Sequence, residues 1–337
     1  MLYVSFGPEL DGVPNVIVDG LDNAATVLTL SHWPQSATPA ALKADTSAEI
    51  VFNYLRSSEA DALKGDAEAI SNNHFDIDGL MGIWSMLNPD AALDHADLIV
   101  AIAECGDFER WTGEHAAKAV CALHALQFMD SSPLHERLAR IVDPDERTAF
   151  LYDEMLPFVR SLLRDIDSLE EFWRDEYERI AAGRRLFETG TAEVEERREL
   201  DLAVFTLPEP VHPIALNERT ACSRVVLMID EFHYLLRYRY ESWVEYQSRE
   251  VPARIDLGPF ADFLQTFEGN PGYWKADDVA SIVPLLRLED EDVDVATSSI
   301  TPGLFSNLVA QFLRENADNQ PLLWSPATAD MGAPAGR

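Results

Sequence analysis

The sequence contains very little lysine. It has 26 basic residues against 59 aspartates and glutamates, and its formal net charge is −33. The lysines are Lys43, Lys64, Lys118 and Lys275, and every other basic residue is an arginine. A surface this acidic repels nucleic-acid phosphate, so we expect no binding to duplex nucleic acid. A small anionic substrate is still compatible with the charge, because metal ions and a few arginines can reverse the local field.

Cysteines and long apolar runs are scarce as well. Cys105, Cys121 and Cys222 are too few and too scattered for a disulfide framework or a zinc site built from cysteines. No apolar run approaches the roughly 20 residues needed to cross a bilayer. The first residues, MLYVSFGPELDG, lack the charged start and long apolar stretch of a signal peptide. We therefore expect a cytoplasmic globular protein that does not enter a membrane.

Strand-like and helix-like segments alternate in the first part of the chain. Short β-branched or apolar runs predict strands at residues 2–6, 15–19, 26–30, 67–70 and 98–103. Thr46 and Glu49 have capping-box spacing and predict a helix start, and apolar spacing predicts a second helix over 80–87. Such alternation is typical of an α/β fold, a mostly parallel sheet with helices on both faces. The ligand of such a sheet lies beyond the carboxyl ends of its strands.

The segment from Ser71 to Gly79 carries the strongest functional pattern. His74, Asp76 and Asp78 alternate after a predicted strand, and alternate side chains of extended backbone point to the same side. Gly79 would let the chain turn directly into a helix whose N-terminus faces the same point. The alternative is that His74 and Asp76 simply cap this helix.

Other predicted strands end in the same kinds of side chain. Asp19, His32 and Asp107 each follow such a strand, with Glu104 as the competitor of Asp107. Together with the segment from Ser71 to Gly79, these strand ends predict a binuclear metal centre at the carboxyl edge of the sheet.

Three segments resemble the DHH-type phosphoesterases. The run VIVDGLDNAATVLTLSHWPQSATPAALKADTSAEIVFNYL is similar to the part of that superfamily that leads from a strand-end Asp through the DHH signature to a helix. NNHFDIDGLMGIW resembles its first metal motif, and IAECGDFERWTGEHAA its closing strand-end Asp motif. The order of the motifs is permuted relative to the known families. In addition, Ser31-His32-Trp33 stands where Asp-His-His would be expected. The chain also looks like an uncharacterised bacterial family.

The resemblance implies a set of roles for these residues. His74 and Asp76 would hold one divalent ion and Asp78 the other, with His32 as the signature histidine, Asp19 as the bridging carboxylate and Asp107 as a shared ligand. Among them, His32, Asp76 and Asp78 would be the catalytic residues. Oxygen ligands mixed with imidazole suit Mn²⁺, with Mg²⁺ or Zn²⁺ as alternatives. The implied reaction is hydrolysis of a small phosphorylated or nucleotide substrate. The departures at Ser31 and Trp33 favour an alternative, an inactive binding or regulatory protein of the same fold.

The remaining chain suggests a second domain and a connector. We predict a metal-binding α/β domain over 1–130, a helical connector over 131–200 with a polar linker near 188–199, a smaller α+β domain over 201–315 and a disordered tail over 316–337. Arg237, Arg239, Arg249 and Arg254 are candidates for binding a substrate phosphate or carboxylate, or else form ion pairs within this acidic chain. An exposed aromatic stripe over 169–187 would instead favour a partner-binding scaffold.

Overall fold

The computed structural model describes residues 1–230, 232–291 and 293–328. The chain divides into two compact units, Met1–Arg179 and Ile180–Arg337. In the three described ranges, no helix combines the length and the apolar composition that a membrane span requires.

The first unit is built around a parallel sheet. Its strands are β1 (Leu2–Tyr3), β2 (Asn15–Val18), β3 (Thr26–Leu30) and β4 (Ala69–Ser71). They lie side by side in the order β1-β4-β2-β3, and every pairing between them is parallel. Because the strands are parallel, the chain leaves all of them at the same edge of the sheet. This edge is where the sequence predicts the ligand.

Two helices of the first unit lie between β3 and β4 in the sequence, and the others follow β4. The helices are α1 (Ser47–Arg56), α2 (Ala60–Lys64), α3 (Ile77–Leu87), α4 (Pro89–Leu93), α5 (Ala96–Asp107), α6 (Glu114–Phe128), α7 (His135–Leu138), α8 (Pro144–Met155), α9 (Val159–Arg164) and the start of α10 (Glu170–Glu188). The division between the two units falls inside α10. As the capping-box spacing predicts, the Thr46 side chain accepts a hydrogen bond from the Glu49 N–H and starts α1.

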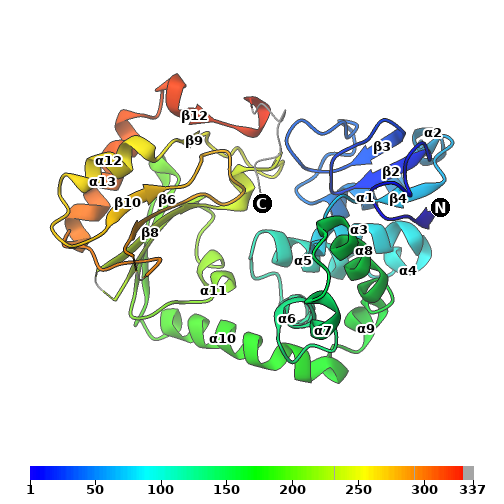
Figure 1. Cartoon of the computed structure of the whole chain (residues 1–337), viewed down its shortest axis with the longest axis horizontal. Helices are drawn as coiled ribbons and strands as arrows, with labels where there is room; N and C mark the ends of the chain where they lie inside the picture. Colours follow the sequence, from blue (N-terminus) through cyan, green and yellow to red (C-terminus); the bar gives the residue numbers. More distant parts are fainter. Residues whose placement is uncertain (231, 292, 329–337) are drawn as a thin grey trace. The chain divides into compact units, whose positions relative to one another are not determined.

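Both faces of this sheet are covered. Helices α1 and α3 pack against each other and against the strands on one side (Figure 1). The approach is close, because a Cβ at Gly82 of α3 would lie 2.6 Å from Val18 Cγ1. On the sheet, Ile17 and Ala69 form a buried cluster with Leu10 from the segment that precedes β2. The first unit therefore has the α/β class that the sequence predicts.

One predicted strand is a helix. Residues 98–103, an unbroken apolar run, lie inside α5. The buried residues of α5 include Ile99, Ile102, Ala103 and Cys105, with the three- and four-residue spacing of a helix that buries one face. A run of six apolar residues fits a buried strand and a buried helix equally well, since periodicity cannot separate them over so short a length. The strand prediction was wrong for this reason.

The second unit contains a mixed sheet. Its strands are β5 (Glu193–Arg197), β6 (Leu202–Leu207), β7 (Arg224–Ile229), β8 (His233–Tyr238), β10 (Tyr273–Ala276) and β11 (Leu285–Glu289), in the order β10-β11-β8-β7-β6-β5. A separate antiparallel pair joins β9 (Arg254–Ile255) to β12 (Leu323–Trp324). The helices are α11 (Pro213–Asn217), α12 (Gly258–Gln265) and α13 (Pro302–Glu315), and this unit is α+β as predicted.

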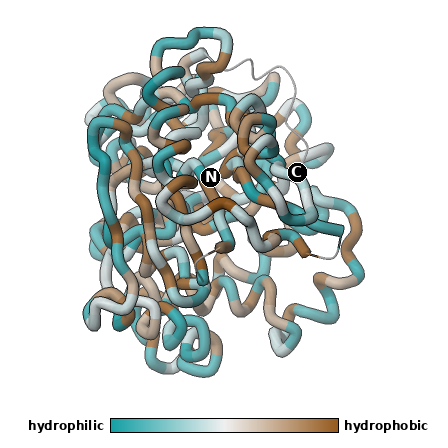
Figure 2. Tube along the Cα trace, turned by 90° about the vertical axis from the view of Figure 1, so that its left-hand side faces the viewer, coloured by the Kyte–Doolittle hydropathy of each residue, from teal (hydrophilic) through white to brown (hydrophobic). Residues whose placement is uncertain are grey.

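The core of the second unit combines strands and helices. Aromatic rings stack within it. Tyr234 of β8 and Trp274 of β10 both stack against Phe305 of α13, with ring-centroid distances of 4.4 and 5.5 Å. In Figure 2, which shows the chain coloured by hydropathy, apolar and polar residues alternate along much of the tube. This alternation reflects strands and helices that each bury one side.

Two predicted irregular segments are regular. The polar stretch 188–199 contains β5, which pairs with β6 at the edge of the mixed sheet, so this stretch is not a simple linker. Residues 316–328, the first part of the predicted disordered tail, contain two 3₁₀ turns and β12. Residues 329–337 of that predicted tail lie outside the described residues. The edge position of β5 explains its polar composition, because an edge strand needs few apolar residues.

Candidate metal centre

Six side chains meet at the carboxyl edge of the parallel sheet. Asp19 follows β2, His32 lies two residues beyond β3, and the loop after β4 carries His74 and Asp76. The last two members are Asp78 from α3 and Asp107 from α5. We call this set the Asp/His cluster, and its members are Asp19, His32, His74, Asp76, Asp78 and Asp107. The structure thus brings together all the candidate metal ligands named from the sequence.

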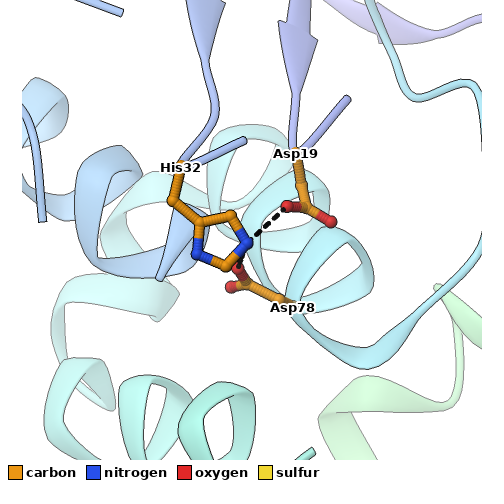
Figure 3. A group of neighbouring side chains, drawn as sticks. All are labelled: Asp19, His32 and Asp78. Atoms are coloured by element: carbon orange, nitrogen blue, oxygen red, sulfur yellow. Dashed lines mark ion pairs between the residues drawn. The ribbon is translucent and has the colours of Figure 1, made fainter. Parts of the chain in front are cut away.

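Asp19, His32 and Asp78 form the inner group of the cluster. Their candidate ligand atoms all lie within 4.8 Å of one another, and all three residues are buried. Figure 3 shows the Nε2 edge of the His32 ring facing both carboxylates, with Nε2 3.4 Å from Asp19 Oδ1 and 3.8 Å from Asp78 Oδ2. Two carboxylates and one imidazole can together hold a divalent ion.

Asp19, His74 and Asp76 form the outer group. Its ligand atoms also lie within 4.8 Å of one another, but His74 and Asp76 are only partly buried. His74 Nε2 lies 3.4 Å from Asp19 Oδ2 and 3.0 Å from Asp76 Oδ2. Asp19 thus contributes one carboxylate oxygen to each group. A carboxylate shared in this way can bridge two ions.

Asp107, the sixth member, comes from the C-terminal end of α5. Its Oδ2 lies 3.5 Å from His32 Nε2. Glu104, its competitor in the sequence analysis, forms an ion pair with Arg110 at 2.8 Å. The sequence predicts Asp107 at a strand end, but α5 delivers it from a helix end.

The backbone at Asp19 and in the turn after it is tightly constrained. Asp19 has a φ of 56°, the left-handed region that Asp and Asn tolerate better than most other residues. The next residue is crowded, since a Cβ at Gly20 would lie 2.2 Å from Asn73 Oδ1. Asn73 Oδ1 in turn accepts a hydrogen bond from the Leu21 N–H at 2.9 Å. The turn after β2 is therefore locked against the loop after β4.

Hydrogen bonds from outside the cluster orient the inner group. His32 Nδ1 lies 2.6 Å from the Asp45 carbonyl oxygen, which can only accept, so Nδ1 carries the proton and Nε2 keeps a lone pair for a ligand. The Ser47 hydroxyl donates to Asp19 Oδ1 at 2.7 Å. The first N–H groups of α1, those of Ser47 and Ala48, donate to the two carboxylate oxygens of Asp78 at 2.6 and 2.7 Å.

The segment from Ser71 to Gly79 is not the extended strand exit that the sequence predicts. Asp76 is the N-cap of α3, and Asp78 lies in the first turn of this helix. Asp76 Oδ1 accepts a hydrogen bond from the Gly79 N–H at 2.8 Å, while Oδ2 faces His74. The capping role considered as the alternative for His74 and Asp76 is therefore present for Asp76, whose carboxylate also belongs to the outer group.

Burial and mutual repulsion shift the proton equilibria of the cluster. Burial, together with neighbouring carboxylates, raises the pKa of Asp19, Asp78 and Asp107. Burial alone would lower the pKa of His74, but the carboxylates of Asp76 and Asp19 raise it to about 10. Burial alone would raise the pKa of Asp76, but the neighbouring His74 lowers it to about 2. His74 Nε2 faces both Asp19 Oδ2 and Asp76 Oδ2, and these two carboxylates favour the charged form of the imidazole.

The cluster fits a divalent metal on two observations. Asp19 Oδ2 and Asp107 Oδ2 are buried, and within the described residues neither accepts a hydrogen bond of normal geometry, although His74 Nε2 and His32 Nε2 lie 3.4 and 3.5 Å from them. A cation bound between these groups would stabilise both carboxylate oxygens. The ligand set itself, four carboxylates and two imidazoles, combines hard oxygen and borderline nitrogen donors. The arrangement can therefore bind metal.

The four candidate substrate-binding arginines lie in the second unit and are engaged by their own surroundings. Arg254 is fully buried and donates to the carbonyl oxygens of residues 279, 281 and 282. Arg239 is buried against Glu241, and Arg237 donates to Asn217 Oδ1 at 3.0 Å. Arg249 lies 3.8 Å from Asp201. Arg239 and Arg249 thus have the acidic partners of the ion-pair alternative, whereas Arg237 contacts an amide and Arg254 carbonyl oxygens.

Four residues that support the cluster have no assigned role in the sequence analysis. They are Asp45, Ser47, Asn72 and Tyr152. Ser47 and Asn72 lie beside recognised motifs, and their position next to the motifs is a usable signal. Tyr152 lies 80 residues from its partner Asn72, and no local pattern in the sequence connects the two.

The whole chain was compared with known proteins. It belongs to a family of unknown function (DUF6687), whose profile matches residues 1–321 and so includes the Asp/His cluster and most of the second unit. Comparison with curated proteins and with solved structures gave no match.

Proposed function

We propose that this protein is a divalent-metal-dependent phosphoesterase that hydrolyses a small phosphorylated or nucleotide substrate. The observation that carries the proposal is the division of the Asp/His cluster into two groups that share Asp19. Two ions held side by side at the carboxyl edge of a parallel sheet are an arrangement that enzymes use for phosphoryl chemistry.

Each group would hold one ion. Asp19, His32 and Asp78 would bind the first, with Asp107 beside them, and Asp19, His74 and Asp76 the second. We favour Mn²⁺, with Mg²⁺ and Zn²⁺ as alternatives. When bound, a pair of divalent ions supplies Lewis acidity and an activated water for an in-line displacement.

The chain itself would orient the ions and favour an anionic substrate. Asp45 and Ser47 fix His32 and Asp19, and the N-termini of α1 and α3 lie at the cluster. The first N–H groups of α1 donate to Asp78 and the Gly79 N–H of α3 donates to Asp76, so these helix N-termini stabilise the ligand carboxylates, and bound ions would attract the substrate phosphate. The acidic surface would still repel long nucleic acids, so the favoured substrate is small.

The resemblance to DHH-type phosphoesterases supports the same reaction class. The residues of the resembling motifs, although permuted in order, lie together in space. Ser31 and Trp33, the two residues that depart from the Asp-His-His signature, each contact a neighbouring residue. The Ser31 hydroxyl accepts a hydrogen bond from the Trp33 N–H, and the Trp33 ring packs against the His74 ring at 4.8 Å. Trp33 cannot donate a proton as a histidine would, and its place against His74 favours a second candidate function, metal-dependent binding without hydrolysis.

The test measures metal binding and hydrolysis on the same samples. Purified full-length chain is titrated with Mn²⁺ by calorimetry and then assayed with a phosphodiester, a phosphomonoester, pyrophosphate and cyclic dinucleotides. Asp19→Asn is the test variant, since Asn tolerates the left-handed backbone and keeps one oxygen for Ser47. Asp22→Asn, an exposed change in the same turn, is the matched control.

The expected result is two ions per chain and hydrolysis of at least one substrate. Asp19→Asn should lower the rate by about 100-fold or more, because metal stabilisation of the transition state is worth several kcal/mol. Asp22→Asn should leave both measurements unchanged. Two bound ions without hydrolysis would favour the binding function, and no bound Mn²⁺ at millimolar concentration would exclude both.

A further inference from the structure

The Asn72 side chain connects the outer group to a distant helix. Asn72 follows β4 directly and is fully buried. Its Oδ1 accepts a hydrogen bond from the His74 N–H at 3.3 Å, and its Nδ2 donates to the Tyr152 hydroxyl at 3.0 Å. The backbone N–H of His74 can only donate, which fixes the amide with Oδ1 toward His74 and Nδ2 toward Tyr152.

Tyr152 gives this contact a rigid base. It belongs to α8, is fully buried, and packs its ring against those of Tyr3 and Phe75, each with a centroid distance of 5.0 Å. The hydroxyl lies against the start of α3, where a Cβ at Gly79 would be 2.7 Å from it and 2.4 Å from Asn72 Nδ2. Any side chain at position 79 would therefore collide with both Asn72 and Tyr152.

The inner group is supported by different residues. His32 is oriented by Asp45, and Asp19 and Asp78 are held by the start of α1. The Asn72–Tyr152 contact reaches the cluster through the backbone of His74, a residue of the outer group alone. Loss of this contact should therefore disturb one group and spare the other.

We propose that Asn72 and Tyr152 are positioning residues that hold His74 in place for the ion of the outer group. This inference rests on the proposed metal centre and assigns part of its support to a residue of α8. Neither residue belongs to the two groups of candidate ligands. Hydrogen-bond partners that orient metal ligands typically change metal affinity by about 10- to 100-fold.

The test uses Tyr152→Phe, which removes the hydroxyl and keeps the ring. Full-length chain is titrated with Mn²⁺ by calorimetry, and electron paramagnetic resonance separates a coupled pair of Mn²⁺ ions from a single ion. Tyr3→Phe removes a hydroxyl from the same aromatic cluster and is the matched control. Asn72→Ala and the double variant Asn72→Ala/Tyr152→Phe complete a double-mutant cycle.

For Tyr152→Phe we expect one binding step weakened about 10- to 100-fold and the other unchanged, so that one equivalent of Mn²⁺ gives a single-ion spectrum. Tyr3→Phe should bind like the unmodified chain. The double variant should weaken the same step no more than Asn72→Ala does, because both changes remove one hydrogen-bond chain. Additive effects in the cycle would contradict the proposal.

Three other outcomes would overturn the inference in distinguishable ways. If the unmodified chain binds two ions and Tyr152→Phe binds both with unchanged affinity, Tyr152 does not position His74. If Tyr152→Phe weakens both steps equally, its role is only structural. If the unmodified chain binds no Mn²⁺, the proposed metal centre itself is wrong.

Discussion

Removal of divalent metal should make the protein less stable, and the loss should grow as the pH rises. The Asp/His cluster buries several carboxylates that repel one another. A group with a higher pKa in the folded chain than in the unfolded chain binds extra protons when folded, so the free energy of unfolding falls as the pH rises above the unfolded-state pKa. Asp19, Asp78, Asp107 and His74 are all shifted in this direction.

The pH window follows from these shifts. It begins near the ordinary pKa of Asp, about 4, and extends to about 10, the pKa of His74 in the folded chain. The lowered pKa of Asp76 has the opposite sign, but it acts only between about 2 and the ordinary Asp value, below this window. Between these limits the metal-free chain should lose stability steadily as the pH increases.

Bound metal should reverse this loss. A ligand at 100 times its dissociation constant stabilises the folded state by about 2.7 kcal/mol per site, or about 5 kcal/mol for two sites. For a unit the size of Met1–Arg179 each kcal/mol corresponds to about 2–4 °C, so Mn²⁺ should raise the melting temperature by roughly 10–20 °C.

The assay is thermal unfolding, followed by circular dichroism, with chelator or with excess Mn²⁺ at about pH 5.5, 7 and 8.5. Asp19→Asn should flatten the pH dependence of the metal-free chain because it removes one buried carboxylate, whereas Asp22→Asn should not. A metal-free chain that becomes more stable from about pH 5.5 to 8.5 would refute the reasoning. So would Mn²⁺ that leaves the melting temperature unchanged.

Four further predictions test other parts of the structure. Mn²⁺ binding at about pH 7 should release at least one proton per chain, displaced from His74, and calorimetry in buffers of different ionisation enthalpy measures it. Gly82→Ala should destabilise by about 1–3 kcal/mol in urea because its Cβ would meet Val18, whereas Gly303→Ala, with no atom within 4 Å, should stabilise slightly. Although burial opposes it, hydrogen bonds from Asn270, Ser298 and Ser299 lower the pKa of Glu268 to about 2. Its contribution should be lost as the pH falls through about 2, and Glu268→Gln should remove this part of the acid transition. Arg254→Met should cost about 3 kcal/mol in urea, since it leaves buried carbonyl oxygens unpaired, and an unchanged midpoint would contradict this.

The sequence predicts the edge of the parallel sheet well. Asp19 and His32 follow strands rich in β-branched or apolar residues, and the helix after Asp78 has clear apolar spacing. Each of these signals is local and lies within a few residues of the side chain it positions. In parallel sheets, ligands lie beyond the carboxyl ends of the strands. This rule predicts that the side chains at these ends lie together, and it needs no knowledge of long-range contacts.

The sequence does not predict what depends on distant contacts. The apolar run in α5 is too short for its periodicity to decide between strand and helix. Arg254 is of a residue type that often binds substrate phosphates, yet its partners are carbonyl oxygens about 25 residues further along the chain. Tyr152 reaches Asn72 only after the helices between them have packed. In each case the deciding contact joins segments that no local pattern relates.

The left-handed backbone at Asp19 also limits which substitutions the protein can tolerate there. Gly, Asn and Asp adopt this conformation at low cost, and most other residues do not. Of these three, only Asp offers two anionic oxygens, one to each group of the cluster. In a saturation library of position 19, selection for folding should retain Gly, Asn and Asp, while selection for metal binding should retain Asp alone. Substitutions at position 19 alone can thus distinguish the requirement for folding from the requirement for metal binding.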